Sequence, residues 1–218
     1  MTLRDIYARY KIMHGLQLHQ LRVAAVAKLI CDNFDEPLEE REVVLTGLFH
    51  DMGNIIKSDL TTFPQFLEPE GLAYWQGVKD EFVRKYGPDE HRANIAIARE
   101  LELPERVCDY IDHLGFSMLK AIKRSSFGHK IAKYADLRVG PFGILSLDER
   151  LSEARERYGR KAKQGSTLSP NDGNFDELAA VAADIEKEIF AHSRIRPEDI
   201  NDRTAAPVIE ELWEYNVS

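Results

Sequence analysis

The sequence contains little cysteine and no long apolar run. Only two cysteines occur among its 218 residues, Cys31 and Cys108. They are far apart in sequence, which argues against a disulfide framework and against a cysteine-ligated zinc or iron–sulfur site. No apolar stretch approaches the ~20 residues that a membrane-spanning helix needs, and the N-terminal segment lacks the apolar core of a signal peptide. We therefore expect a cytoplasmic protein with reduced thiols and no membrane partner.

Positive charge is also scarce. Lysine and arginine number 29 against 37 aspartates and glutamates, so the formal net charge is -8. A chain of this charge is poorly suited to non-specific binding of a nucleic acid polymer or an anionic membrane. A small phosphorylated molecule remains compatible with it, because one cationic pocket or one metal ion can override the net charge locally.

The alternation of apolar and polar residues that marks a β-strand is missing. Apolar residues recur instead at intervals of three and four, which is typical of amphipathic helices. Hydrophobic residues make up 44% of the chain, enough for a substantial core. The pattern predicts an all-α helical bundle. Helices are expected over residues 16–34, 37–52, 90–102, 104–115, 128–139, 147–163, 175–192 and 206–215.

Two segments depart from this pattern. Residues 57–88 are rich in aromatics and are interrupted by proline and glycine, which predicts a helical insertion between core helices. Its rings could pack the insertion onto the bundle or cover a substrate. Residues 164–174 have the composition of a turn-rich linker. We predict a bundle domain over 1–145, which includes the insertion, and a helical extension over 146–218 that packs on the same domain.

Several of the seven histidines occupy positions that face the core. His19 begins a stripe that continues at Val23, and His91 begins another. His50 has Gly47 three residues before it, a small neighbour that we interpret as room for a bulky group. A single inward histidine is usually a hydrogen-bonded core residue, but several buried imidazoles and carboxylates need several partners. A metal ion would satisfy them together.

The order of these residues resembles a known family. His19, then His50-Asp51-Met-Gly, then Lys-Tyr-Ala-Asp136 is similar to the H…HD…D signature of HD-domain metal-dependent phosphohydrolases. His91 and His113 resemble the two extra histidines of the six-ligand dinuclear branch, of which the bacterial diadenosine tetraphosphate hydrolases of the YqeK type have the most similar pattern. The resemblance covers about residues 14–140.

This resemblance implies a centre of two divalent metal ions. One ion would take His19, His50, Asp51 and Asp136, and the second would share Asp51 and add His91 and His113. Four imidazoles and two carboxylates suit iron or manganese best, with cobalt, nickel, zinc and magnesium also compatible. Two such ions would activate a water molecule for in-line attack on a nucleotide or another small phosphate ester.

The same resemblance assigns roles around the metals. Many family members carry lysine directly after the HD-x-G motif, where this chain has Asn54. Lys57 lies one turn later, and we expect it to act with Asp51 in catalysis. The remaining basic candidates for substrate binding are Arg22, Lys130, Lys133 and His129.

Two other functions stay open at this point. The six ligands also resemble those of HD-type mixed-valent di-iron oxygenases, which cleave a C–C or C–P bond. A non-catalytic signalling module is a third interpretation, ranked last because every candidate ligand is present. A homodimer is compatible with the sequence, which does not determine the oligomeric state.

Overall fold

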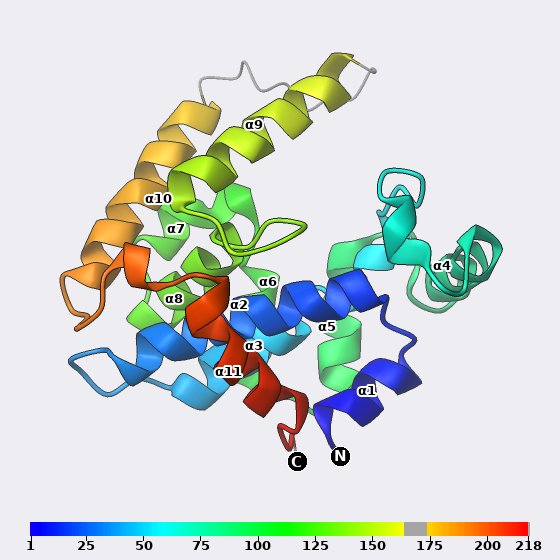
Figure 1. Cartoon of the computed structure of the whole chain (residues 1–218), viewed down its shortest axis with the longest axis horizontal. Coiled ribbons are helices and arrows are strands. Elements are labelled where there is room, and N and C mark those ends of the chain that lie inside the picture. Colours follow the sequence, from blue (N-terminus) through cyan, green and yellow to red (C-terminus); the bar gives the residue numbers. More distant parts are fainter. Residues whose placement is uncertain (164–173, 218) are drawn as a thin grey trace.

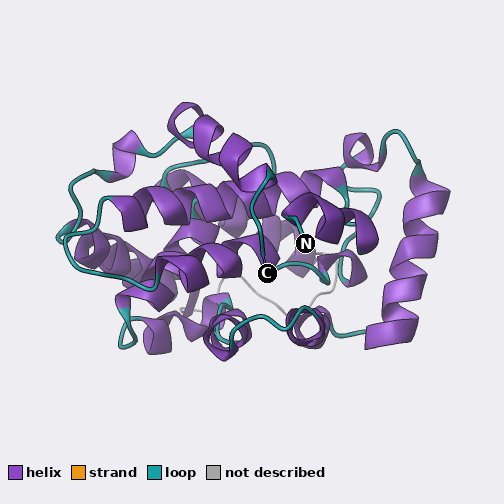
Figure 2. Ribbon diagram, turned by 90° about the horizontal axis from the view of Figure 1, so that it is seen from below, coloured by secondary structure: helices purple, strands orange, loops and turns teal. Residues whose placement is uncertain are grey.

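The chain forms helices over almost all of its described length (Figure 1). This computed structural model describes residues 1–163 and 174–217, without the side chains of 157–163 and 174. Figure 2 shows helices joined by loops, and the described residues contain no β-strand, so the all-α prediction is confirmed. The helices are α1 (Leu3–Arg9), α2 (His14–Asp32), α3 (Glu40–Phe49), η1 (Asn54–Ile56), η2 (Pro64–Leu67), α4 (Leu72–Tyr86), α5 (Glu90–Glu100), α6 (Glu105–Asp112), η3 (Phe116–Met118), α7 (Leu119–Ile122), α8 (Phe127–Leu137), α9 (Leu147–Lys163), α10 (Asn174–Phe190), η4 (Pro197–Asp199) and α11 (Asp202–Trp213).

Helix α2 is the centre of the bundle and packs against α3, α8 and α11. Val23, Ala24 and Ala27 are fully buried on it, and their small side chains allow the neighbouring helices to approach closely. Gly47 of α3 lies directly against α2, because a Cβ atom at this position would come within 2.7 Å of the Ala24 Cα atom. The space beside Gly47 is therefore filled by the α2 backbone. Our interpretation of Gly47 as room for a bulky group was wrong.

The predicted insertion is an arm built from η2 and α4, which lies at one side of the molecule in Figure 1. Trp75, Val78 and Phe82 are buried on α4, and the indole Nε1 of Trp75 donates a hydrogen bond to the Leu67 carbonyl. These aromatic residues thus pack the arm onto its own turns and onto the bundle. The helix that follows begins as predicted, with the Asp89 side chain accepting the first amide hydrogen bonds of α5.

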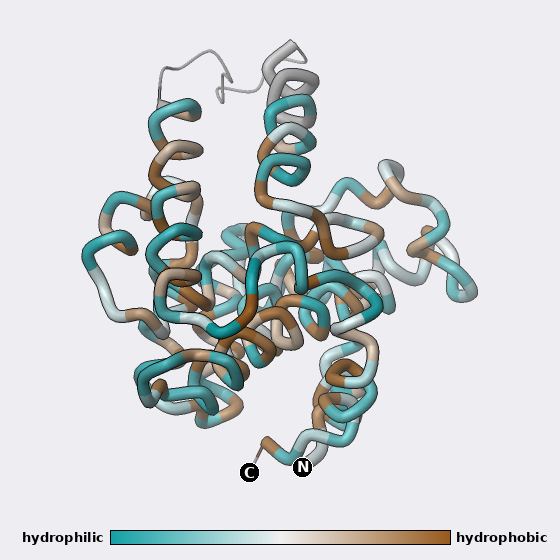
Figure 3. The backbone as a smooth tube through the Cα atoms, turned by 60° about the vertical axis from the view of Figure 1, so that its left-hand side comes forward, coloured by the Kyte–Doolittle hydropathy of each residue, from teal (hydrophilic) through white to brown (hydrophobic). Residues whose placement is uncertain are grey.

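The C-terminal helices cover the bundle from outside. Helix α10 packs on α7 and α8, and α11 packs on α1 and α2. The two ends of the chain lie side by side (Figure 3), with the Leu3 amide donating to the Tyr215 carbonyl. The linker predicted over 164–174 lies outside the described residues, except for Asn174, which begins α10. The division into two domains at residue 145 remains a prediction.

The sequence pattern did not predict α1 or α7, which span only two turns and one turn and are too short to show a helical period. Among the described residues, no helix combines the length and the apolar character that crossing a membrane would require.

Arg138, just after α8, connects the bundle to the C-terminal segment. Its side chain is buried and donates hydrogen bonds to the carbonyls of Leu145, Pro197 and Ile200 and to the Tyr134 hydroxyl. A buried guanidinium with this many partners fixes the position of the chain on both sides of it.

We expect Arg138→Met to lower the free energy of unfolding by about 3 kcal/mol or more, because it leaves buried carbonyl groups without donors. Urea denaturation followed by circular dichroism measures this change. Arg196→Met serves as the control, since the Arg196 side chain is exposed and pairs with Asp199. An equal effect of both substitutions would contradict the role assigned to Arg138.

We expect Gly47→Ala to destabilise the protein by about 1–3 kcal/mol, because the added methyl group overlaps the α2 backbone. The matched control is Gly77→Ala in α4, where a Cβ atom would meet nothing within 4 Å. This control should be stabilising by roughly 0.5–1 kcal/mol, the ordinary helix-propensity gain. Thermal and urea unfolding of both variants decide whether the close approach of α2 and α3 is required.

Candidate metal centre

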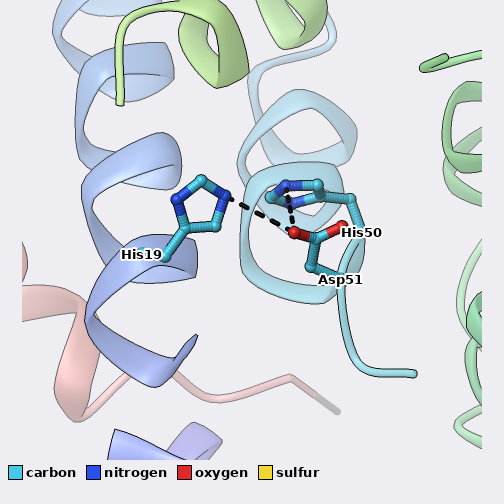
Figure 4. Close-up of side chains that lie close together, drawn as sticks. All are labelled: His19, His50 and Asp51. Carbon is cyan, nitrogen blue, oxygen red and sulfur yellow. Dashed lines mark ion pairs between the residues drawn. The ribbon is translucent and has the colours of Figure 1, made fainter. Parts of the chain in front are cut away.

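Four side chains from three helices converge at the inner end of α3. The Nε2 atom of His19 lies 3.6 Å from Asp51 Oδ2 and 3.7 Å from Asp136 Oδ1. The Nε2 atom of His50 lies 3.7 Å and 3.6 Å from the same two oxygens. Figure 4 shows the His19 ring projecting from α2 toward the His50–Asp51 pair at the end of α3.

The local backbone explains why adjacent residues can reach a common point. Helix α3 ends at Phe49, and His50 is its C-cap, so Asp51 already follows the turn that leaves the helix. The Asp51 amide donates to Gln20 Oε1, and the Gly53 amide donates to Asn94 Oδ1. These two hydrogen bonds fix the segment that carries the carboxylate.

His50 is held in one orientation and has a free nitrogen. Its Nδ1 atom forms a hydrogen bond of 2.9 Å with the Gly47 carbonyl, so in the neutral ring, the form that binds a metal ion, Nδ1 carries the proton and Nε2 presents a lone pair. Nε2 is buried and has no hydrogen-bond partner among the described residues. Burial alone would lower the pKa of His50, but the negative charges of Asp51 and Asp136 outweigh it and raise the pKa to about 9. The site therefore favours a positive charge between these groups.

Asp136 is fixed by a lysine of its own helix. Lys133, one turn earlier on α8, is buried and places its Nζ atom 2.8 Å from Asp136 Oδ2. Burial would raise the pKa of Asp136, but the Lys133 charge and the neighbouring imidazoles of His19 and His50 hold it well below its usual value. Asp136 is therefore ionised, with Oδ1 directed at the two imidazoles.

This arrangement fits a divalent metal ion. Two ligands bonded at ~2.1 Å to one tetrahedral ion lie roughly 3.4 Å apart, close to the observed donor separations of 3.6–3.7 Å. Two imidazoles and two carboxylates suit manganese, iron, cobalt, nickel or zinc. Among the described residues, the potential ligand atoms of His19, His50 and Asp51 all lie within 4.8 Å of one another. Asp136 is outside this group of three, but its Oδ1 atom lies 3.6–3.7 Å from both imidazoles, so it is a candidate fourth ligand.

The structure does not bring the other two candidate ligands into this group. His91 lines the same pocket, but its Nε2 atom is hydrogen-bonded to Asp112 and its side chain is 47% exposed. His113 is the C-cap of α6, and its Nδ1 atom bonds to the Asp109 carbonyl one turn back. The His113 side chain is 42% exposed and does not line the pocket. The predicted second set of metal ligands is therefore not assembled.

Only some of the basic residues predicted for catalysis or substrate binding line the pocket. Lys57 and Lys133 line the pocket, and Lys57 is exposed and pairs with Glu90 at 3.3 Å. Arg22 and Lys130 do not line it.

Arg22 pairs with Asp202 of α11, and Lys130 pairs with Glu188 of α10 at 2.9 Å. Both are therefore contacts between the bundle and the C-terminal helices. His129 stacks on Tyr110, and burial lowers its pKa. His129 is buried and does not line the pocket, so it is a core residue.

The pocket around the four ligands has a volume of about 630 Å³. Its walls include Phe63 and Phe66 of the insertion, and the Phe66 ring covers Gly15, where a Cβ atom would approach it to 2.9 Å. Arg150 of α9 also lines it. The sequence analysis missed Arg150 because nothing in its local pattern distinguishes it from the other charges of a polar helix.

Comparison with known proteins gives one result that bears on this site. The family model for the HD domain matches residues 17–139, which is more than half of the chain and includes all four converging side chains. Neither the curated proteins nor the solved structures contain a significant match. The order His19, His50-Asp51, Asp136, the helical fold and the matched segment agree, and the chain belongs to the HD-domain family.

Proposed function

We propose that this protein is a metal-dependent phosphohydrolase that acts on a small phosphate ester, such as a nucleotide. The observation that carries the proposal is the convergence of His19, His50, Asp51 and Asp136 in a pocket large enough for a substrate. Membership of the HD-domain family, whose members are generally metal-dependent hydrolases, supports it.

Each residue of the site has a distinct task in this proposal. A divalent ion held there would lower the pKa of a water molecule and neutralise charge on the phosphoryl group. His19 and His50 supply neutral nitrogen ligands, and the Gly47 carbonyl keeps the His50 ring in the tautomer that this requires. Lys133 holds Asp136 in place, which leaves Oδ1 for the ion. Lys57, at the pocket rim, is placed to meet the phosphate of an entering substrate.

We expect the purified protein to release phosphate from at least one ester in a panel of nucleotides and sugar phosphates when manganese, iron, cobalt or nickel is present. Asp51→Asn should reduce the rate to about 1% or less, because even residues that only support metal ligands usually contribute 10–100-fold. Asp80→Asn, on the exposed face of α4, is the matched control and should retain full activity. Equal phosphate release by the Asp51 and Asp80 variants would refute the proposal.

We also expect elemental analysis to find about one tightly bound ion per chain, because only four of the six candidate ligands converge. His19→Ala should remove the ion, whereas His113→Ala should retain it, since His113 is half exposed and bonded to Asp109. Two ions in the wild type, with one lost in His113→Ala, would contradict this expectation. That result would favour a dinuclear centre, for which the di-iron oxygenase alternative would need testing by oxygen uptake.

A further inference from the structure

Part of the pocket wall lies outside the segment that matches the HD family. The match ends at residue 139, but the pocket continues along Gly140 and Pro141 and onto Arg150, Leu151 and Ala154 of α9. The C-terminal extension therefore contributes a wall to the same space that contains the four ligands. Because this wall lies outside the family match, its side chains can give this protein a substrate preference of its own.

Among the described residues of that added wall, Arg150 carries the positive charge, and its side chain is held in one orientation. Its side chain is only 15% exposed. Its Nε atom donates to the Val139 carbonyl at 2.9 Å, and its Nη1 atom pairs with Glu153, which is not part of the pocket. Val139 is three residues after Asp136, so the guanidinium is anchored close to the ligand-bearing end of α8.

The remaining donors of Arg150 are uncommitted. A guanidinium has five N–H donors, and within the described part of the chain the Nη2 atom of Arg150 has no hydrogen-bond partner. The other two cations of the pocket differ from it. Lys133 is occupied by Asp136, and Lys57 is more than half exposed beside Glu90. Arg150 thus combines burial, fixed orientation and free donors, which together favour recognition of a planar or tetrahedral anion.

We propose that Arg150 forms an anion site within the pocket, which binds a second phosphate group of a substrate whose first phosphate lies at the four-residue centre. This proposal rests on the phosphohydrolase function and specifies its substrates more closely. The preferred substrates carry two phosphate groups at separate positions. The extension then acts as a specificity element, and Arg150 determines which esters bind well. A charged hydrogen bond in a largely buried setting should increase affinity about tenfold.

The test uses non-hydrolysable ligands, so that it does not depend on turnover. Isothermal titration calorimetry of the manganese-loaded full chain compares 1,4-butylenebisphosphonate with butylphosphonate. The wild type should bind the bisphosphonate about tenfold more tightly. Arg150→Met should abolish this advantage and leave the affinity for butylphosphonate unchanged. Arg150→Lys keeps the charge and should keep part of the advantage, which covers the case in which the methionine variant fails to fold.

Arg155→Met is the matched control, because Arg155 is on the same helix but is exposed and pairs with Asp176. It should behave as the wild type. Absence of a bisphosphonate advantage in the wild type, or its persistence in Arg150→Met, would overturn the anion site. Equal weakening of both ligands in Arg150→Met and Arg150→Lys would show a purely structural role and would also overturn it. The phosphate-release assay reports separately on the phosphohydrolase function, so the two proposals can fail independently.

Discussion

Two carboxylates lie close together between α2, α3 and α8, and the arrangement of the site depends on how their negative charge is compensated. Asp51 and Asp136 face the same two imidazoles in a largely buried space, where unpaired carboxylates are unfavourable. Neighbouring side chains and backbone groups compensate for this charge or fix its position. Lys133 neutralises one oxygen of Asp136, and Gly47 allows α3 to approach α2 closely enough for the two imidazoles to meet, with ring centroids 5.4 Å apart.

Much of the fold could be predicted from the sequence, because long helices with apolar stripes have a clear period. The four converging ligands could be predicted too, since the H…HD…D order fixes which residues meet once the helices pack. His113 could not be placed in this way. Its position at the end of α6 lets its ring bond to the Asp109 carbonyl of its own helix, a local contact that no spacing rule reveals.

The sequence also did not show which basic residues face the pocket. Arg22 is three residues after His19, and Lys130 is three residues before Lys133. Ion pairs nevertheless turn Arg22 toward α11 and Lys130 toward α10. Arg150 is distant in sequence from every ligand and is brought to the pocket only by the packing of α9. Charge in a sequence gives the number of cations available, whereas tertiary packing determines which of them face the substrate.

The four converging side chains come from separate parts of the chain, which has a thermodynamic consequence for any ion bound between them. An unfolded chain cannot present His19, His50 and Asp136 together, so an ion that binds them binds only the folded protein. Folding and metal occupancy are then linked, and an ion at 100 times its dissociation constant would add about 2.7 kcal/mol to stability. A shortage of such an ion would thereby lower the stability of the folded protein as well as any activity that depends on the ion.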